Sequence, residues 1–194
     1  MWKSYVSGFI DNQMRVIDHD EGGRTTSEGQ AYGMFFSLVA NDRSHFDGLL
    51  RWTEQNLAGG NLSENLPAWL WGHGSNDHWG VLDKNSASDA DIWMAYTLLE
   101  AGKAWNEPRY TKIGTGLARQ IAEREIANVP GLGTIVMPGP TGFQHGSFVS
   151  AECKLRTFTT HSWTQSFHAR WPLGESGSDR LDDSQQLSAT RLCF

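Results

Sequence analysis

Apolar residues recur at helical spacing from residue 2 to residue 126, with polar residues and glycines between the runs. The spacing predicts helices over residues 2–10, 25–40, 42–58, 88–105 and 106–126. Asn41 or Asp42 caps the third helix and Gly59-Gly60 ends it, so one helix follows another through a short connection. This pattern is typical of an antiparallel helical array, and it predicts an all-α fold with a small β-hairpin.

The last two predicted helices each carry an inward stripe. In residues 88–105 the stripe consists of Ile92, Ala95, Leu98, Leu99, Gly102 and Trp105. In residues 106–126 it consists of Tyr110, Ile113, Leu117, Ile121 and Ile126. After about Gln144 the chain shows no sustained period, so we divide it into residues 1–144 and an irregular tail, residues 145–194.

The stretch Thr25–Met34 opens the second helix with a carboxylate, an aromatic residue and two glycines. Glu28 precedes Tyr32 by four positions, so the two side chains share a face. Gly29 and Gly33 share the next face, where another backbone or a ligand can approach closely. These features are compatible with the wall of a pocket. The local pattern alone favours a plainer interpretation, in which Glu28 completes a capping arrangement and Tyr32 fills core.

The helix over residues 88–105 begins in a similar way. Asp89 lies at its start and Trp93 follows four positions later, as Tyr32 follows Glu28. Two helices built alike would place two carboxylates at one end of a helical array. Asp91 comes close behind, and acidic residues in a first turn suit the helix dipole.

The connection over residues 61–87 is rich in tryptophan, glycine, asparagine and aspartate. Long ordered loops in compact domains are usually functional. Trp69 and Trp71 alternate, so in an extended segment they point to opposite sides, which predicts one in the core and one facing a groove. The sequence leaves open the alternative that both are buried.

Composition narrows the class of ligand. The 194 residues include nine tryptophans, which favour surfaces that bind flat partners such as sugars or bases. The formal net charge is −6 and no basic stripe is visible, which argues against nucleic acid as a partner. No apolar run reaches the length of a membrane span, and we expect no membrane insertion. Cys153 and Cys193 have no spacing that indicates a metal or redox site.

Paired carboxylates suggest acid–base chemistry. Glycoside hydrolysis needs two carboxyl groups on either side of the scissile bond, and the acid must be kept protonated by burial or by a neighbouring charge. A metal held by Asp89 and Asp91 is a weaker alternative, because the two side chains diverge at a helix start. The chain has no Gly-x-Ser-x-Gly elbow and no His-x-x-x-His spacing, so a serine triad and a zinc site are poorly supported.

Four segments resemble the family-8 glycoside hydrolases, in particular the endoglucanases encoded with bacterial cellulose synthase. The segment Thr26–Met34 resembles the family's stretch around the general acid, and Ala87–Ala101 with Trp105 resembles its signature stretch. Leu66–Gly72 and Val129–Gly133 are similar as well. The likeness extends from Trp2 to about Phe143.

The resemblance implies part of an (α/α)6 barrel that cleaves internal β-1,4-glucosidic bonds with inversion. It implies that Glu28 is the proton donor and that Asp89 holds the sugar being cleaved. It also implies a glucan-binding surface composed of Gln30, Tyr32, Trp69, Trp71 and Trp93. By the same resemblance we expect β-1,4-glucan chains as partners, no metal or organic cofactor, a periplasmic or secreted location, and an association with cellulose synthesis.

The chain departs from the family in its last part. The family's catalytic base is an aspartate on a later helix, for which this chain offers no matching segment. An abrupt loss of likeness is what a shift of reading frame produces, so we expect residues 145–194 to be out of frame or disordered. The alternative function is a catalytically incomplete fragment that still binds glycans.

Overall fold

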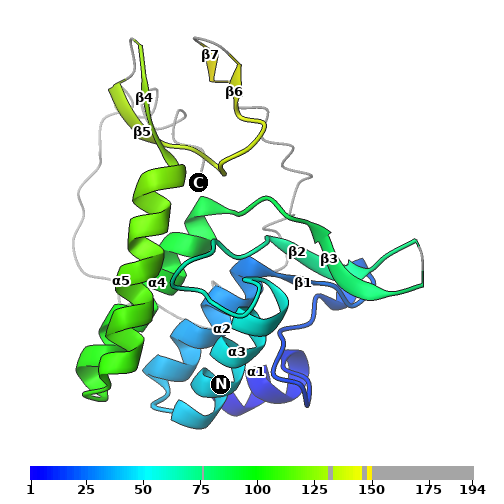
Figure 1. Ribbon diagram of the computed structural model, residues 1–194. Helices are drawn as coiled ribbons and strands as arrows, with labels where there is room; N and C mark the ends of the chain where they lie inside the picture. Colours follow the sequence, from blue (N-terminus) through cyan, green and yellow to red (C-terminus); the bar gives the residue numbers. More distant parts are fainter. Residues whose placement is uncertain (76, 131–132, 146–147, 150–194) are drawn as a thin grey trace, which may run out of the picture. The chain divides into compact units, whose positions relative to one another are not determined.

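In the computed structural model, helices make up about half of the described chain, which comprises residues 1–75, 77–130, 133–145 and 148–149 (Figure 1). These residues belong to one unit, Met1–Ala151. The helices are α1 (Trp2–Phe9), α2 (Ser27–Val39), α3 (Arg43–Asn56), α4 (Ser88–Ala104) and α5 (Pro108–Arg124). The predicted helices are confirmed in place and order. Nearly all of the predicted tail, residues 150–194, lies outside the described residues.

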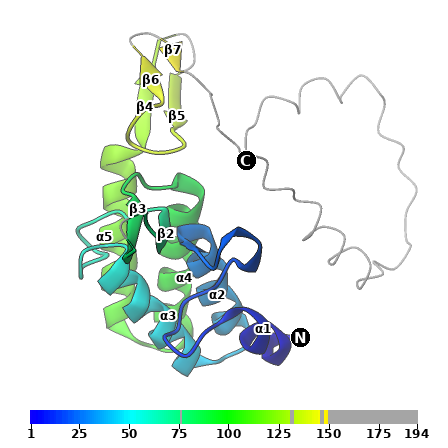
Figure 2. The same ribbon diagram turned by 90° about the vertical axis from the view of Figure 1, so that its right-hand side faces the viewer.

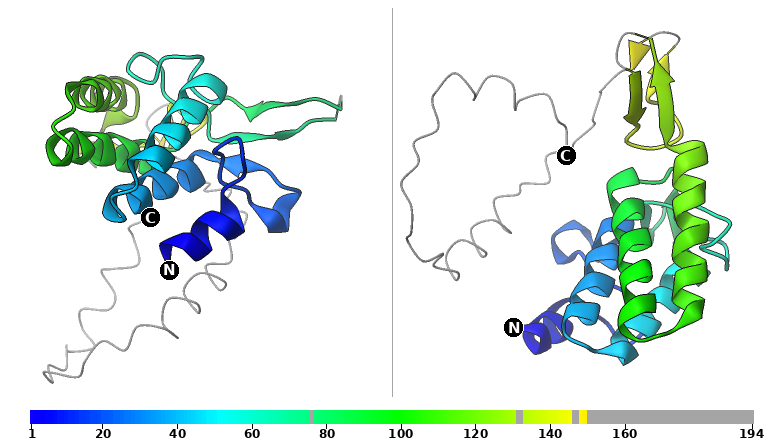
Figure 3. Two further views of the ribbon diagram at one scale, coloured as in Figure 1. Left: turned by 90° about the horizontal axis from the view of Figure 1, so that it is seen from below. Right: turned by 90° about the vertical axis from the view of Figure 1, so that its left-hand side faces the viewer.

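The long helices pack side by side in the order α3, α2, α4 and α5, as Figures 2 and 3 show. Consecutive helices run in opposite directions, so α2 and α4 both begin at the same end of the layer (Figure 1). The core between them contains large apolar side chains that are fully buried, among them Met34, Phe46, Leu49, Leu50, Met94, Leu98 and Leu117. The start of α2 and the start of α4 are thereby brought together.

Three small antiparallel sheets accompany the helices in the described part of the chain. The first contains β1 (Thr25–Thr26), β2 (Leu70–His73) and β3 (Trp79–Asp83). The others pair β4 (Ile126–Val129) with β5 (Gly133–Val136), and β6 (Gln144–His145) with β7 (Phe148–Val149). Strand β1 leads directly into α2 and pairs Thr25 with Trp71, so the first sheet holds the entry to α2 against the Trp-rich loop.

Two predicted inward positions are wrong. Helix α5 ends at Arg124, so Ile126 begins β4 and is 40% exposed. In α4 the predicted inward residue Ile92 is 44% exposed, whereas the residue before it, Asp91, is buried. The apolar pattern could not predict this, because the buried residue carries a carboxyl group and the exposed one is apolar.

The segment before α2 folds back onto that helix. The side chain of Val16 packs against Gly29 and Gly33, where an added Cβ would lie 3.4 Å and 3.0 Å from it. The two glycines thus serve the close approach of Val16, and the face of α2 that carries them belongs to the interior.

Candidate active site

Glu28 lies in the first turn of α2, which begins because the Thr26 hydroxyl accepts the backbone N–H of Gly29 at 3.1 Å. The carboxylate of Glu28 is partly buried and accepts a hydrogen bond from the Ser27 hydroxyl at 3.2 Å. Burial raises the pKa of Glu28, and the nearby charge of Asp89 raises it further. Hydrogen bonds from its own backbone N–H and from the hydroxyls of Ser27 and Thr26 oppose the rise without reversing it.

Asp89 is exposed in the first turn of α4. Its charge acts on Glu28 and also on Tyr32, whose pKa is raised by burial and then by the charges of Asp89 and Glu28. The structure therefore brings Glu28, Asp89 and Tyr32 into one electrostatic neighbourhood at the starts of the two parallel helices. A partly buried carboxyl group with a raised pKa beside an exposed carboxylate is a candidate for acid–base chemistry.

Aromatic side chains continue from Glu28 along the adjoining faces of α2 and α4. Tyr32 meets Trp93 edge to face at 6.3 Å between ring centroids, and Phe35 meets Trp93 at 5.0 Å. Trp93 also contacts Tyr96 at 5.8 Å. Tyr32 and Trp93 are 38% and 37% exposed, so each offers ring surface beside the two carboxylates.

Trp69 connects the two helix starts through its backbone. Its carbonyl oxygen accepts the N–H of Ser27 at 2.9 Å, and its own N–H donates to the carbonyl of Asn85 at 2.8 Å. Ser27 directly precedes Glu28, so Trp69 lies next to the site, and its side chain is partly buried. That its side chain binds glucan stays a prediction.

Trp71 belongs to a separate aromatic cluster on the first sheet. Its ring stacks on Trp79 at 5.2 Å and meets Trp52 edge to face at 5.3 Å. The guanidinium of Arg15 lies 4.9 Å from its ring centroid. A bulge between Leu70 and Trp71 interrupts the strand, so simple alternation does not describe this segment. The prediction that Trp71 binds glucan remains a prediction.

Gln30 lies in the core, and this contradicts the prediction that it contacts a glucan. Its side chain is 0% exposed. Oε1 accepts the backbone N–H of Val16 at 2.6 Å, and Nε2 donates to the Thr53 hydroxyl at 3.1 Å and to the Leu49 carbonyl at 3.4 Å. The amide thus holds the segment before α2 and helix α3 together.

The sequence did not reveal that two further carboxyl groups, those of Asp91 and Glu125, are buried. Both residues are 0% exposed. Asp91 precedes the buried residues Met94 and Ala95 by three and four positions, and this spacing places it on the buried stripe of the helix. An inward stripe that begins at residue 91 instead of residue 92 would have included this carboxyl group. The alternative of a metal held by Asp89 and Asp91 is unfavourable, because one side chain is exposed and the other is enclosed.

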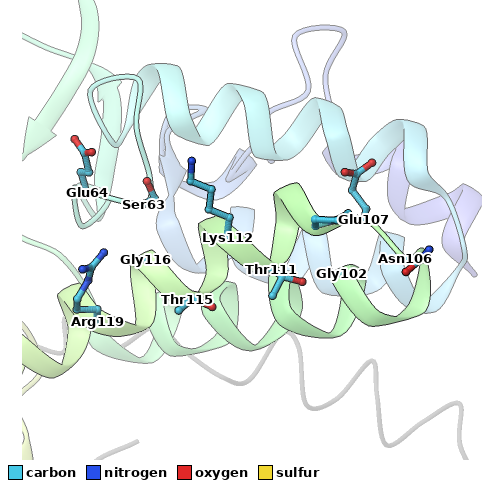
Figure 4. A pocket seen from close by; sticks show the side chains of 11 residues that line it. Ser63, Glu64, Gly102, Asn106, Glu107, Thr111, Lys112, Thr115, Gly116 and Arg119 are labelled. Atoms are coloured by element: carbon cyan, nitrogen blue, oxygen red, sulfur yellow. The ribbon is translucent and has the colours of Figure 1, made fainter.

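Other features of the described chain also bear on its ligands. Among the described residues, no group of three or more histidine, cysteine, aspartate or glutamate side chains is arranged to hold a metal ion. An open hollow of about 620 Å³ lies along α5, lined by residues that include Ser63, Glu64, Thr111, Lys112 and Arg119 (Figure 4). None of the predicted site residues lines this hollow. No described helix is long and apolar enough to cross a membrane.

The parallel helix starts, the two carboxylates and the exposed aromatic rings are compatible with a helical protein that acts on carbohydrates. Comparison with known families agrees: the family model for glycosyl hydrolases family 8 matches residues 1–188. The chain belongs to this family.

Relatives and solved structures support the same membership. The endoglucanase of Escherichia coli O157:H7 is 55% identical over 143 residues, which cover 73% of this chain and 39% of that protein. The endoglucanase of Pseudomonas fluorescens is 46% identical over 146 residues, which cover 75% of this chain and 37% of that protein. The endo-1,4-D-glucanase of Vibrio fischeri ES114 superposes with a TM-score of 0.72 at 49% identity, covering 75% of this chain and 42% of that structure.

The chain thus spans about two fifths of the length of the curated relatives it matches. Family-8 structures are (α/α)6 barrels, and helices α2 to α5 correspond to part of such a barrel. The predicted fold class is confirmed for the described residues.

Proposed function

We propose that this chain binds a β-1,4-glucan over the starts of α2 and α4, and that Glu28 is the proton donor for endo-acting hydrolysis of the glucan. The observation that carries the proposal is the position of Glu28, partly buried in the first turn of α2 and near Asp89 in the first turn of α4, where burial and the charge of Asp89 raise its pKa. A carboxyl group that retains its proton near neutral pH can protonate the departing glycosidic oxygen. The named activity of the family-8 relatives supports the choice of substrate.

In the proposed reaction, Glu28 gives its proton to the oxygen of the scissile bond as that bond breaks. An inverting enzyme places a base roughly 6.5–9.5 Å from the acid, where it activates a water on the opposite face of the sugar. Asp89 contacts the sugar at the cleavage point in our proposal. The resemblance places the base on a helix later than those described, so we expect it from outside the described residues.

The exposed rings of Tyr32 and Trp93 are suited to pack against sugar faces, since pyranose rings present flat apolar C–H surfaces. Trp69 extends this surface from the loop that is hydrogen-bonded to Ser27. The net charge of −6 is compatible with a neutral glucan and disfavours polyanions. A periplasmic or secreted location and work alongside cellulose synthesis are further parts of the proposal, and they rest on the resemblance alone.

A second function is glycan binding alone, and it is favoured by what the described residues contain. They include the proposed acid and the exposed aromatic rings, and among them no catalytic base is assigned. This glycan-binding alternative retains Asp89 and the aromatic surface, and it predicts no bond cleavage.

The test measures reducing-end release and loss of viscosity with a soluble β-1,4-glucan, together with glucan binding by the same preparations. We expect release by the parent, loss of release in Glu28→Gln, and no change in Glu123→Gln, an exposed position on α5. Binding without release in a folded parent would replace hydrolysis with the glycan-binding alternative. Absence of both binding and release would refute a glucan site.

A further inference from the structure

Two carboxyl groups meet in the interior beside the proposed site and take no part in it. Asp91 is in the first turn of α4, and Glu125 directly follows the last residue of α5. Both are 0% exposed, and each acts on the pKa of the other. An ionised carboxylate is costly to bury, and two adjacent ones are costlier still because they repel each other.

The hydrogen bonds around the pair are incomplete unless one carboxyl is a donor. The Ser86 hydroxyl donates to Oε1 of Glu125 at 2.5 Å. Among the described residues, no donor in hydrogen-bond geometry reaches either oxygen of Asp91 or Oε2 of Glu125. Buried polar oxygens are rarely left without partners. A proton held between the two carboxyl groups would give these oxygens a hydrogen bond.

We propose that Asp91 and Glu125 share one proton, with the Asp91 carboxyl donating to the Glu125 carboxylate. The pair then carries a single negative charge, which the Ser86 hydroxyl also stabilises. Burial raises the pKa of both groups, and the charge of Glu125 raises that of Asp91 further. Asp89 is an additional charged group that acts on both members.

The shared proton links the start of α4, where Asp89 lies, to the end of α5. Asp91 fixes the start of α4, Ser86 fixes the turn before it, and Glu125 fixes the end of α5. The backbone reinforces this arrangement, because Ser88 donates to the Pro138 carbonyl at 3.1 Å and Met137 donates to the Glu125 carbonyl at 2.7 Å. We therefore assign Asp91 and Glu125 as positioning residues for Asp89. The positioning role rests on the proposed function, whereas the shared proton does not.

An amide can replace the protonated carboxyl, since its N–H₂ donates in the same place without a titrating proton. We expect Asp91→Asn and Glu125→Gln to fold with melting temperatures near or above that of the parent at neutral pH. Asp91→Ala leaves the Glu125 charge buried without its partner, and we expect a fall on the order of 10 °C. Glu123→Gln is the matched control, because Glu123 is exposed on α5 only two positions before Glu125. We expect it to leave the melting temperature unchanged.

The pH dependence of stability separates a shared proton from ordinary packing. The folded protein keeps the proton above the pH at which unfolded carboxyls release it, so the pair's contribution falls as pH rises toward its raised pKa. Asp91→Asn removes this titration. We expect its melting temperature to gain on the parent by at most about 3–5 °C per pH unit above pH 4. Infrared spectroscopy should show a protonated-carboxyl band in the parent at neutral pH that Asp91→Asn lacks.

Equal pH slopes in parent and Asp91→Asn, together with no difference in that infrared band, would overturn the shared proton. For the positioning role, we expect Asp91→Asn to retain affinity for a soluble cello-oligosaccharide and folded Asp91→Ala to lose about tenfold or more. Equal affinity in all three would overturn positioning. A parent that binds no oligosaccharide would defeat the proposed function while the infrared and melting results still decide the proton.

Discussion

Replacing Gln30 with methionine tests whether this residue belongs to the core or to a glucan surface. Methionine keeps the length of the side chain but can neither accept from the Val16 N–H nor donate to Thr53 and Leu49. The perturbation is thus confined to hydrogen bonding. Because Gln30 is 0% exposed, we predict a loss of stability with no direct effect on a ligand.

The expected magnitude follows from the three bonds. Removing the acceptor leaves the Val16 N–H unsatisfied next to α2, which costs about 1–3 kcal/mol. The two bonds donated by the amide add roughly 1 kcal/mol, since the Thr53 hydroxyl keeps its own bond to the Leu49 carbonyl at 2.9 Å. The sum of about 2–4 kcal/mol corresponds to a fall in melting temperature of about 5–15 °C for a chain of this size.

The assay is thermal and urea unfolding of parent and Gln30→Met, followed by a cello-oligosaccharide titration at a temperature where both are folded. We predict a lower melting temperature and an unchanged affinity. An unchanged melting temperature with weakened binding would show that Gln30 contacts the ligand, and it would refute the placement of this side chain in the core.

Three other predictions concern single positions. Asp42→Ala removes the cap of α3 and the acceptor for the Trp2 indole N–H at 2.9 Å, and we expect it to cost about 1–2 kcal/mol at neutral pH by urea unfolding. Burial raises the pKa of Asp42, but hydrogen bonds lower it by more, so its pKa in the folded protein lies below the ordinary value. The stability lost in Asp42→Ala should therefore disappear as pH falls through that lowered pKa, and a loss that stays constant with pH would contradict this prediction. Gly116→Ala places a Cβ 2.6 Å from the Ser63 backbone carbonyl, and we expect a loss of about 1–3 kcal/mol, whereas exposed Thr115→Ala should cost far less. Asp89→Asn removes a charge that raises the pKa of Glu28, so the pKa of Glu28 measured by NMR should fall. An unchanged or higher pKa would show that the charge of Asp89 does not act on Glu28.

Caps and apolar periods predicted the helices well because they are local signals. Asp42 was one of the two caps expected for α3, and its side chain accepts the backbone N–H of His45. Two of the helices begin with a carboxylate that is followed four positions later by an aromatic residue, namely Glu28 with Tyr32 and Asp89 with Trp93. This repeated pattern predicted that the two carboxylates would lie at one end of the helical layer. Their placement depends on helix direction and length, which the sequence pattern conveys.

Burial of polar side chains was not predictable in the same way. Gln30 is one position away from the glycine face of α2, and only the packing of Val16 and α3 decides that its amide is enclosed. Asp91 was interpreted as a residue suited to the helix dipole, and its partner Glu125 lies beyond the end of another helix. Long-range contacts of this kind leave no period in the sequence, so the buried carboxyl pair emerges only from the structure.

The most direct test of the proposed site is a carbon-13 NMR titration of the Glu28 carboxyl, with and without a soluble cello-oligosaccharide. We predict that Glu28 titrates above the ordinary glutamate value of about 4.3, and that the oligosaccharide shifts its resonance. An ordinary pKa together with a resonance that the oligosaccharide leaves unchanged would contradict Glu28 as the acid of a glucan site.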